Sequence, residues 1–141
     1  RLRYNHTLNS GWDSRTTLDA ALYHRKHFRK EKGYMLSQNI GYRGSNKIRG
    51  DFFAGYFRSD TYASRLYSYE RNILSTFYMP SFYGKGVRWA ASGRYNITPK
   101  LSLSAKIGRT RYFDRDTIGS GTELINGNSR TDLFTYLRWQ F

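Results

Sequence analysis

Apolar and polar residues alternate along most of the chain, the pattern of β-strands that have one apolar and one polar face. In residues 86–97, Val87 and Trp89 fall on one face, and Arg88 and Arg94 fall on the other. The same period predicts nine strands, at residues 2–9, 14–25, 34–43, 47–58, 61–70, 73–82, 86–97, 100–113 and 131–141. No helical pattern of useful length accompanies them, so the predicted fold class is all-β.

The fifth and sixth predicted strands depart from the clean alternation of the others. Residues 61–70 and 73–82 carry apolar side chains on both faces, and Pro80 interrupts the second of them. We predict two separate strands here because of the lengths of the connections. Nine strands put the long connectors 24–33 and 114–130 at one end of the sheet. The tight turns, around Gly11 and at 44–46, 70–72 and 98–99, then lie at the other end.

Composition excludes several classes of protein. The chain of 141 residues contains no cysteine, so disulfide scaffolds, zinc fingers and thiol nucleophiles are excluded. Mean hydropathy is −0.76, and no apolar run approaches the roughly 18 residues of a transmembrane helix. Aromatic residues make up 18% of the chain, which favours strands. We expect one segment, residues 1–141, without a second domain.

Two architectures fit strands with one apolar face. In a soluble β-sandwich or barrel the apolar faces form the core, whereas in a membrane barrel they meet lipid and the polar faces line the interior. The predicted strands run to about 10 residues or more, the length that crosses a bilayer when tilted. Aromatic residues fall toward the strand ends, at Tyr4, Tyr34, Tyr42, Trp89, Tyr95, Phe113 and Trp139. The pattern favours an antiparallel up-and-down transmembrane β-barrel.

The chain ends within an alternating strand, "TDLFTYLRWQF", in which Trp139 precedes the terminal Phe141 by two residues. This ending resembles the C-terminal signal of bacterial outer-membrane β-barrels, which the barrel-assembly machinery reads. It departs from the fuller pattern at Tyr136, where a glycine is usual, and at Phe134, where a polar residue is usual. We expect the last strand to pair with residues 100–113, and its Leu133, Leu137, Trp139 and Phe141 to face lipid.

About the last 60 residues are similar to the tail of outer-membrane barrel proteins that carry helix-hairpin-helix domains before the barrel. The resemblance is carried by "YGKG", "TRYFDRDTIGSG", "INGN" and the closing "LRW" with its Phe. It implies that the chain is the C-terminal part of a larger Gram-negative outer-membrane protein. Strand parity agrees, because bacterial barrels have an even number of strands, and nine strands predict at least one more before Arg1. Expected partners are outer-membrane lipid and lipopolysaccharide, the assembly machinery, and the rest of the same barrel or another outer-membrane subunit. No helix-hairpin-helix sequence occurs here, so no nucleic acid is implied.

The net charge is +14, from 24 Lys and Arg against 10 Asp and Glu. The alternation places a set of charges on the predicted interior: Arg15, Asp19, Arg49, Asp51, Arg88, Arg94, Lys106 and Arg138, together with Arg3, Arg25 and Lys100. Either these charges form ion pairs that order the lumen or a plug, or they make the lumen selective for anions. The basic segment 24–33 is a further candidate for contact with lipid phosphates. Acids are too few to pair with every arginine.

Catalytic and metal chemistry find little support. His24 and His27 would lie on opposite faces of a strand, and no cysteine or carboxylate completes a metal set, so no metal and no cofactor is expected. His6 and His24 with Asp13, Asp19 and Asp51 are the residues from which a barrel hydrolase or protease would be built. We predict a non-enzymatic pore, transport or structural component of the outer membrane. The alternatives are a basic soluble β-domain that binds nucleic acid and, more remotely, a barrel hydrolase.

Overall fold

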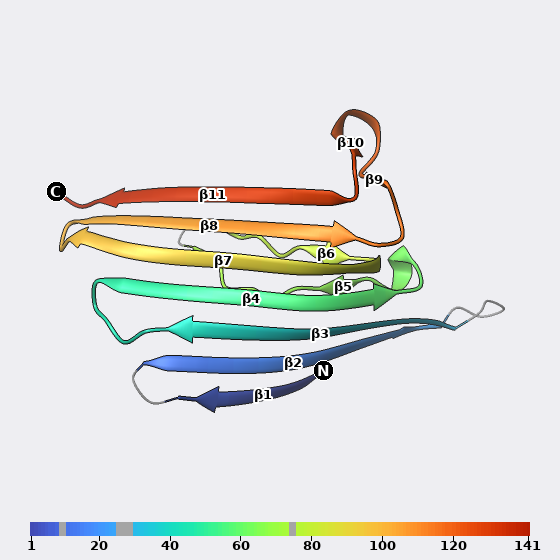
Figure 1. The fold of residues 1–141 in the computed structure, drawn as a ribbon, viewed down its shortest axis with the longest axis horizontal. Helices are drawn as coiled ribbons and strands as arrows, with labels where there is room; N and C mark the ends of the chain where they lie inside the picture. Colours follow the sequence, from blue (N-terminus) through green and yellow to red (C-terminus); the bar gives the residue numbers. More distant parts are fainter. Residues whose placement is uncertain (9–10, 25–29, 74–75) are drawn as a thin grey trace.

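A computed structural model describes residues 1–8, 11–24, 30–73 and 76–141. It is all-β, with one antiparallel sheet of seven strands in the order β1-β2-β3-β4-β7-β8-β11 (Figure 1). These strands are β1 (Leu2–Thr7), β2 (Trp12–Tyr23), β3 (Glu31–Tyr42), β4 (Ile48–Ser59), β7 (Gly84–Thr98), β8 (Leu101–Tyr112) and β11 (Ser129–Trp139). No helix within the described ranges is long and apolar enough to cross a membrane.

The sheet is an up-and-down meander, because each long strand pairs with the next long strand along the chain. The turns β1–β2, β3–β4 and β7–β8 lie at one end, which we call the tight-turn end. The connections β2–β3, β4–β7 and β8–β11 lie at the other, the long-connector end (Figure 1). β11 pairs with β8 from Ser129↔Arg111 to Trp139↔Leu101, which confirms the predicted pairing of the last strand. β1 and β11 form the two edges and do not close the sheet into a barrel.

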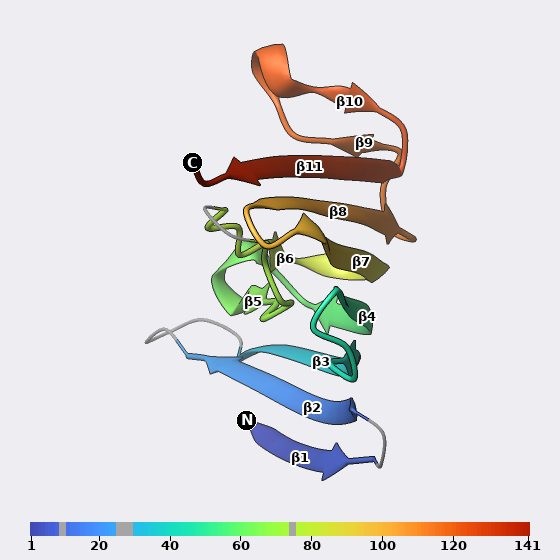
Figure 2. The same cartoon turned by 90° about the vertical axis from the view of Figure 1, so that its left-hand side faces the viewer.

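The prediction of nine long strands is wrong at residues 61–70 and 73–82. This region instead holds a 3₁₀ helix, η1 (Tyr62–Ser64), and two short strands, β5 (Leu66–Tyr67) and β6 (Ser81–Phe82), which pair with each other. Residues 60–73 and 76–83 lie over one face of the sheet, where Figure 2 shows β5 and β6 beside the inner strands. The predicted turn at 70–72 is therefore a stretch inside this segment. We call residues 60–83 the inserted segment.

The reason for the difference lies in the surroundings of the inserted segment. A strand in a meander needs one apolar face, and this segment carries apolar residues on both. Pro80 has no N–H to donate to a sheet ladder. Thr61 caps η1 in a capping box, in which its side chain accepts from Ala63 N–H and the Ser64 side chain accepts from Thr61 N–H. Local hydrogen bonding thus ends the strand run after Ser59.

The alternation of side chains gives the sheet two different faces. We call the face under the inserted segment the covered face and the opposite one the bare face. On β8 every second residue from Ser102 to Tyr112 is buried on the covered face, and the intervening residues are partly or fully exposed on the bare face. The apolar core lies between the covered face and the inserted segment and consists of Met35, Phe53, Phe57, Leu66, Phe82, Ala90 and Tyr112.

Gly33 allows the inserted segment to approach β3. A Cβ at this position would lie 2.4 Å from the backbone oxygen of Ser64, closer than real contacts allow. Gly33→Ala is expected to lower the free energy of unfolding by about 1–3 kcal/mol through overpacking. The matched control is Gly50→Ala, since a Cβ there meets nothing closer than 3.8 Å. Equilibrium unfolding of both variants checks this, and equal effects would contradict the close contact.

Candidate functional site on the covered face

The eight charged residues predicted to share a face do share one. Cross-strand pairing places Arg15, Asp19, Arg49, Asp51, Arg88, Arg94, Lys106 and Arg138 on the covered face. Arg3 joins them through its pairing with Thr17. Arg25 lies outside the described residues, as does half of the basic segment 24–33, namely residues 25–29. Whether this face lines a lumen stays a prediction.

A buried ion network ties the inserted segment to the middle of the covered face. Glu70, from the inserted segment, accepts from Arg88 Nη2 of β7 at 2.8 Å and lies 3.6 Å from Lys106 Nζ of β8. Arg88 Nη1 also donates to Asp132 of β11 at 2.7 Å. The side chains of Glu70, Arg88 and Lys106 are each only 1% exposed. Ionised groups buried this deeply need partners, so these contacts hold four chain segments together.

A second group of ion pairs lies nearer the tight-turn end. Arg71 of the inserted segment donates to Asp51 on β4 at 2.6 Å and to Asp13 on β2 at 2.7 Å. Asp51 also accepts from Arg43 at 2.8 Å. Further along the sheet, Arg1 pairs with Asp19 at 2.5 Å. Adjacent residues Glu70 and Arg71 therefore bind opposite charges on the same face.

Ionisation states in the inserted segment match this network. Burial, together with the neighbouring Asp132 carboxylate, raises the pKa of the Tyr78 phenol to about 12. Tyr78 therefore keeps its proton and donates to Asp132 Oδ1 at 3.0 Å. For Arg71, burial alone lowers the pKa, but hydrogen bonds with Asp13 and Asp51 outweigh it and raise the pKa above the usual arginine value. Its guanidinium stays charged.

The structure divides the predicted charges into two groups. Asp19, Asp51, Arg88 and Lys106 take part in ion pairs. Within the described ranges, Arg15, Arg49, Arg94 and Arg138 form no ion pair with a carboxylate. Arg15 donates instead to the Asn5 side chain at 3.0 Å, and Arg94 donates to the Asn96 side chain at 3.1 Å. Part of the predicted set is therefore ion-paired and part is not, and whether these charges make a lumen selective for anions stays a prediction.

Sequence reasoning missed the residues that complete the network. Glu70, Arg71 and Tyr78 fall in the wrongly predicted strands and turn, so their side chains had no assigned face. One signal was available. The interior positions of the strands carry more bases than acids, and a buried arginine such as Arg88 requires a carboxylate from elsewhere. Glu70, in a segment with poor alternation, was one of the acids without an assigned face.

The residues considered for hydrolytic chemistry are not assembled into a site. His6 pairs across strands with Ser14 on the bare face, whereas Asp13, Asp19 and Asp51 lie on the covered face and are bound by arginines. His24 is exposed beyond the end of β2, and His27 lies outside the described residues. The described part of the chain holds no group of three potential metal ligands.

The terminal aromatic residues lie at the sheet edge. Trp139 ends β11 with its side chain on the bare face and is 71% exposed. Phe141 follows it and is fully exposed. Their role as an assembly signal stays a prediction.

The fold defines an all-β protein built on a seven-stranded antiparallel meander with one face covered by an inserted segment. The chain matches no protein-family model, and searches of curated proteins and of solved structures find no match either.

Proposed function

We propose that this chain is part of a bacterial outer-membrane β-barrel and acts without enzymatic chemistry as a pore, transport or structural component. One observation carries the proposal: the covered face buries charged side chains beside its apolar core, whereas the opposite face exposes large apolar side chains. Arg88 and Lys106 are buried on the covered face, while Leu133 and Leu137 are 67% and 62% exposed on the bare face. A soluble sheet has the reverse arrangement, but a membrane strand faces lipid with its apolar side.

The dimensions of the sheet support a membrane-spanning role. Five of its strands have 11 or 12 residues and β7 has 15, against about 9–11 for a tilted transmembrane strand. The sheet is also staggered. Following the cross-strand pairs from Trp12 leads to Thr135, four residues short of the end of β11 at Trp139. Such a stagger accompanies tilted strands in barrels.

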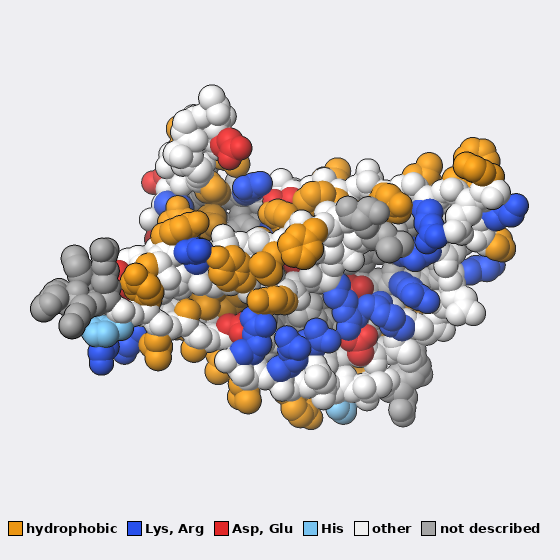
Figure 3. Space-filling model, turned by 180° about the vertical axis from the view of Figure 1, so that it is seen from behind, with side chains coloured by type: hydrophobic (Ala, Val, Ile, Leu, Met, Phe, Trp, Pro, Cys, Tyr) orange, Lys and Arg blue, Asp and Glu red, His pale blue; other side chains and the backbone are white. Residues whose placement is uncertain are grey.

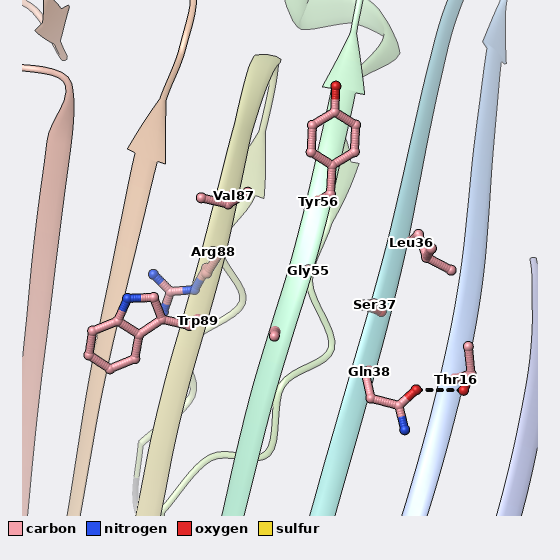
Figure 4. Close-up of a pocket in the computed structure, with 10 residues that line it drawn as sticks. Thr16, Leu36, Ser37, Gln38, Gly55, Tyr56, Val87, Arg88 and Trp89 are labelled. Carbon is pink, nitrogen blue, oxygen red and sulfur yellow. Dashed lines mark hydrogen bonds between the residues drawn. The ribbon is translucent and has the colours of Figure 1, made fainter.

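Three polar side chains on the bare face satisfy one another, as a lipid-facing surface requires. Thr16 donates to Gln38 Oε1 at 2.5 Å, and Gln38 Nε2 donates to Ser14 at 2.6 Å. Thr16 and Gln38 line a hollow of about 440 Å³ on this face, and Figure 4 shows their hydrogen bond on one side of it and the apolar Trp89 on the other.

The two ends of the bare face differ in a way that fits an asymmetric membrane. At the long-connector end it carries exposed basic residues on neighbouring strands: Lys32, Arg58, Lys85, Arg109 and Arg111. Arg58 and Lys85 lie directly opposite each other, an arrangement that needs nearby anions. Lipid phosphates of the outer leaflet would supply them, since long connectors are extracellular in bacterial barrels. At the tight-turn end, the rings of Trp12 and Tyr42 have centroids 4.9 Å apart. Such aromatic residues are typical of a membrane interface, here the periplasmic one.

The proposed partners follow from this placement. Outer-membrane lipid and lipopolysaccharide would contact the bare face, and the barrel-assembly machinery would read β11 with Trp139 and Phe141. The exposed edges of β1 and β11 would pair with the rest of the same barrel or with another outer-membrane subunit.

Lipid contact is tested with the fluorescence of single tryptophans. Trp89 lies on the bare face of β7, so a variant that keeps only Trp89 should be strongly quenched in vesicles with brominated acyl chains. The matched control lacks the three native tryptophans and carries Phe82→Trp, which places its only tryptophan in the buried core. Its fluorescence should be quenched little. A protein that stays monomeric in buffer without detergent, with Trp89 unquenched by these vesicles, would exclude the membrane assignment.

A further inference from the structure

A basic hollow lies on the covered face at the tight-turn end. It has a volume of about 470 Å³, and four of the residues that line it are cations: Lys47, Arg94, Lys100 and Arg138. No carboxylate lines it. Figure 3, which views the covered face, shows Lys and Arg side chains gathered from the middle of the molecule toward this end.

A second, smaller hollow of about 220 Å³ adjoins the first through Arg94, which lines both. Arg49 also lines it and lies directly opposite Arg94 on the neighbouring strand. Like charges directly opposite each other destabilise a sheet unless an anion lies between them. Asp51, the carboxylate in this hollow, already accepts from Arg43 and Arg71.

Arg94 is held in place by a contact that leaves its terminal nitrogens available. Its Nε donates to the Asn96 side chain at 3.1 Å, and Asn96 Nδ2 donates to the backbone oxygen of Asn46 at 2.7 Å. Among the described residues, neither Nη1 nor Nη2 of Arg94 has a hydrogen-bond partner. A guanidinium oriented in this way binds phosphate or carboxylate groups through two parallel hydrogen bonds.

From these observations we propose that the tight-turn end of the covered face binds small, multiply charged anions that carry phosphate or carboxylate groups. Arg94 is the central ligand, with Arg49 on one side and Arg138 on the other. The volume suits a small solute and not a macromolecule. A role of this site in permeation rests on the proposed function. Anion binding does not, because it requires only the residues of the covered face.

Binding is tested first, with inorganic pyrophosphate as the probe and the folded protein in detergent micelles. Calorimetric titration should show binding that weakens with added salt. Arg94→Gln and Arg138→Gln should each weaken it about tenfold, the effect of losing one charge-assisted hydrogen bond. Arg15→Gln, which removes a cation of the covered face that lines neither hollow, is the matched control and should bind within about twofold of the wild type.

A second measurement keeps the result independent of changes in folding. Pyrophosphate should raise the thermal midpoint of the wild type and of the Arg15→Gln variant by similar amounts, and that of Arg94→Gln by less. Absence of pyrophosphate binding by the wild type, or an affinity of Arg94→Gln and Arg138→Gln equal to that of the wild type, would overturn the site. Binding by a protein that does not enter membranes would support the site while refuting the membrane role.

Discussion

Glu70→Gln is expected to lower the free energy of unfolding by about 3–5 kcal/mol, the usual cost of removing one partner of a buried ion pair. Gln matches Glu in size but carries no charge, so Arg88 and Lys106 would lose their shared counter-charge. Arg88 would keep Asp132 as a counter-charge and its 3.0 Å hydrogen bond to Thr110, and Lys106 would keep the 2.6 Å hydrogen bond from its Nζ to Asn72. Chemical unfolding followed by tryptophan fluorescence measures the change.

Limited trypsin digestion gives a local readout of the same variant. If Glu70 fastens the inserted segment, its removal should release Arg65 and Arg71 to cleavage well before the sheet unfolds. The matched control is Glu123→Gln, since Glu123 is exposed and forms no ion pair with any described residue. A loss of less than about 1 kcal/mol, with unchanged cleavage at Arg65 and Arg71, would show that the buried network does not hold the segment.

Phe57→Ala is expected to cost about 3–5 kcal/mol, the range for removing a fully buried phenylalanine. Phe57 is completely buried on the covered face and stacks on Phe82 of the inserted segment, with ring centroids 4.6 Å apart. Its ring also packs edge-to-face with Tyr112, with the ring centroids 5.5 Å apart. Truncation would open a cavity between the sheet and the inserted segment, so both would be weakened together.

The matched control is Phe52→Ala, on the same strand but on the bare face, where Phe52 is 45% exposed. Its loss leaves no cavity, so we expect about half the cost of Phe57→Ala or less. Equilibrium unfolding of both variants in the same detergent gives the comparison. A larger loss for Phe52→Ala would mean that the apolar core lies on the bare face, which would also refute the membrane assignment.

Alternation predicted the long strands and their faces well, because each has only one covered side. The predicted strand 47–58 became Ile48–Ser59, and 100–113 became Leu101–Tyr112. Side-chain parity depends only on this period, so the eight interior charges were placed on a single face. Boundaries shifted most at β3, which begins at Glu31 and not at residue 34.

The inserted segment could not be predicted by the same means. Its position depends on contacts distant in sequence, such as Arg71 with Asp13, which are 58 residues apart. The local pattern carries no information about such pairs. With apolar residues on both of its faces, the segment 61–70 had the pattern of an irregular strand. The candidate site was predicted only as a set of like-facing cations. The distinction between paired Arg88 and free Arg94 depends on where Glu70 lies.

The two open edges of the sheet have an energetic consequence for any passage into a membrane. Along β1 and β11, alternate residues direct their backbone N–H and C=O groups away from the sheet. Water satisfies these groups, but in hydrocarbon each unsatisfied one costs several kcal/mol. β11 alone has 11 residues. The free-energy cost of the unpaired backbone groups along its edge would therefore offset much of the gain from placing Leu133 and Leu137 in lipid. Insertion and edge pairing must therefore occur as one coupled step, in which backbone hydrogen bonds set the barrier.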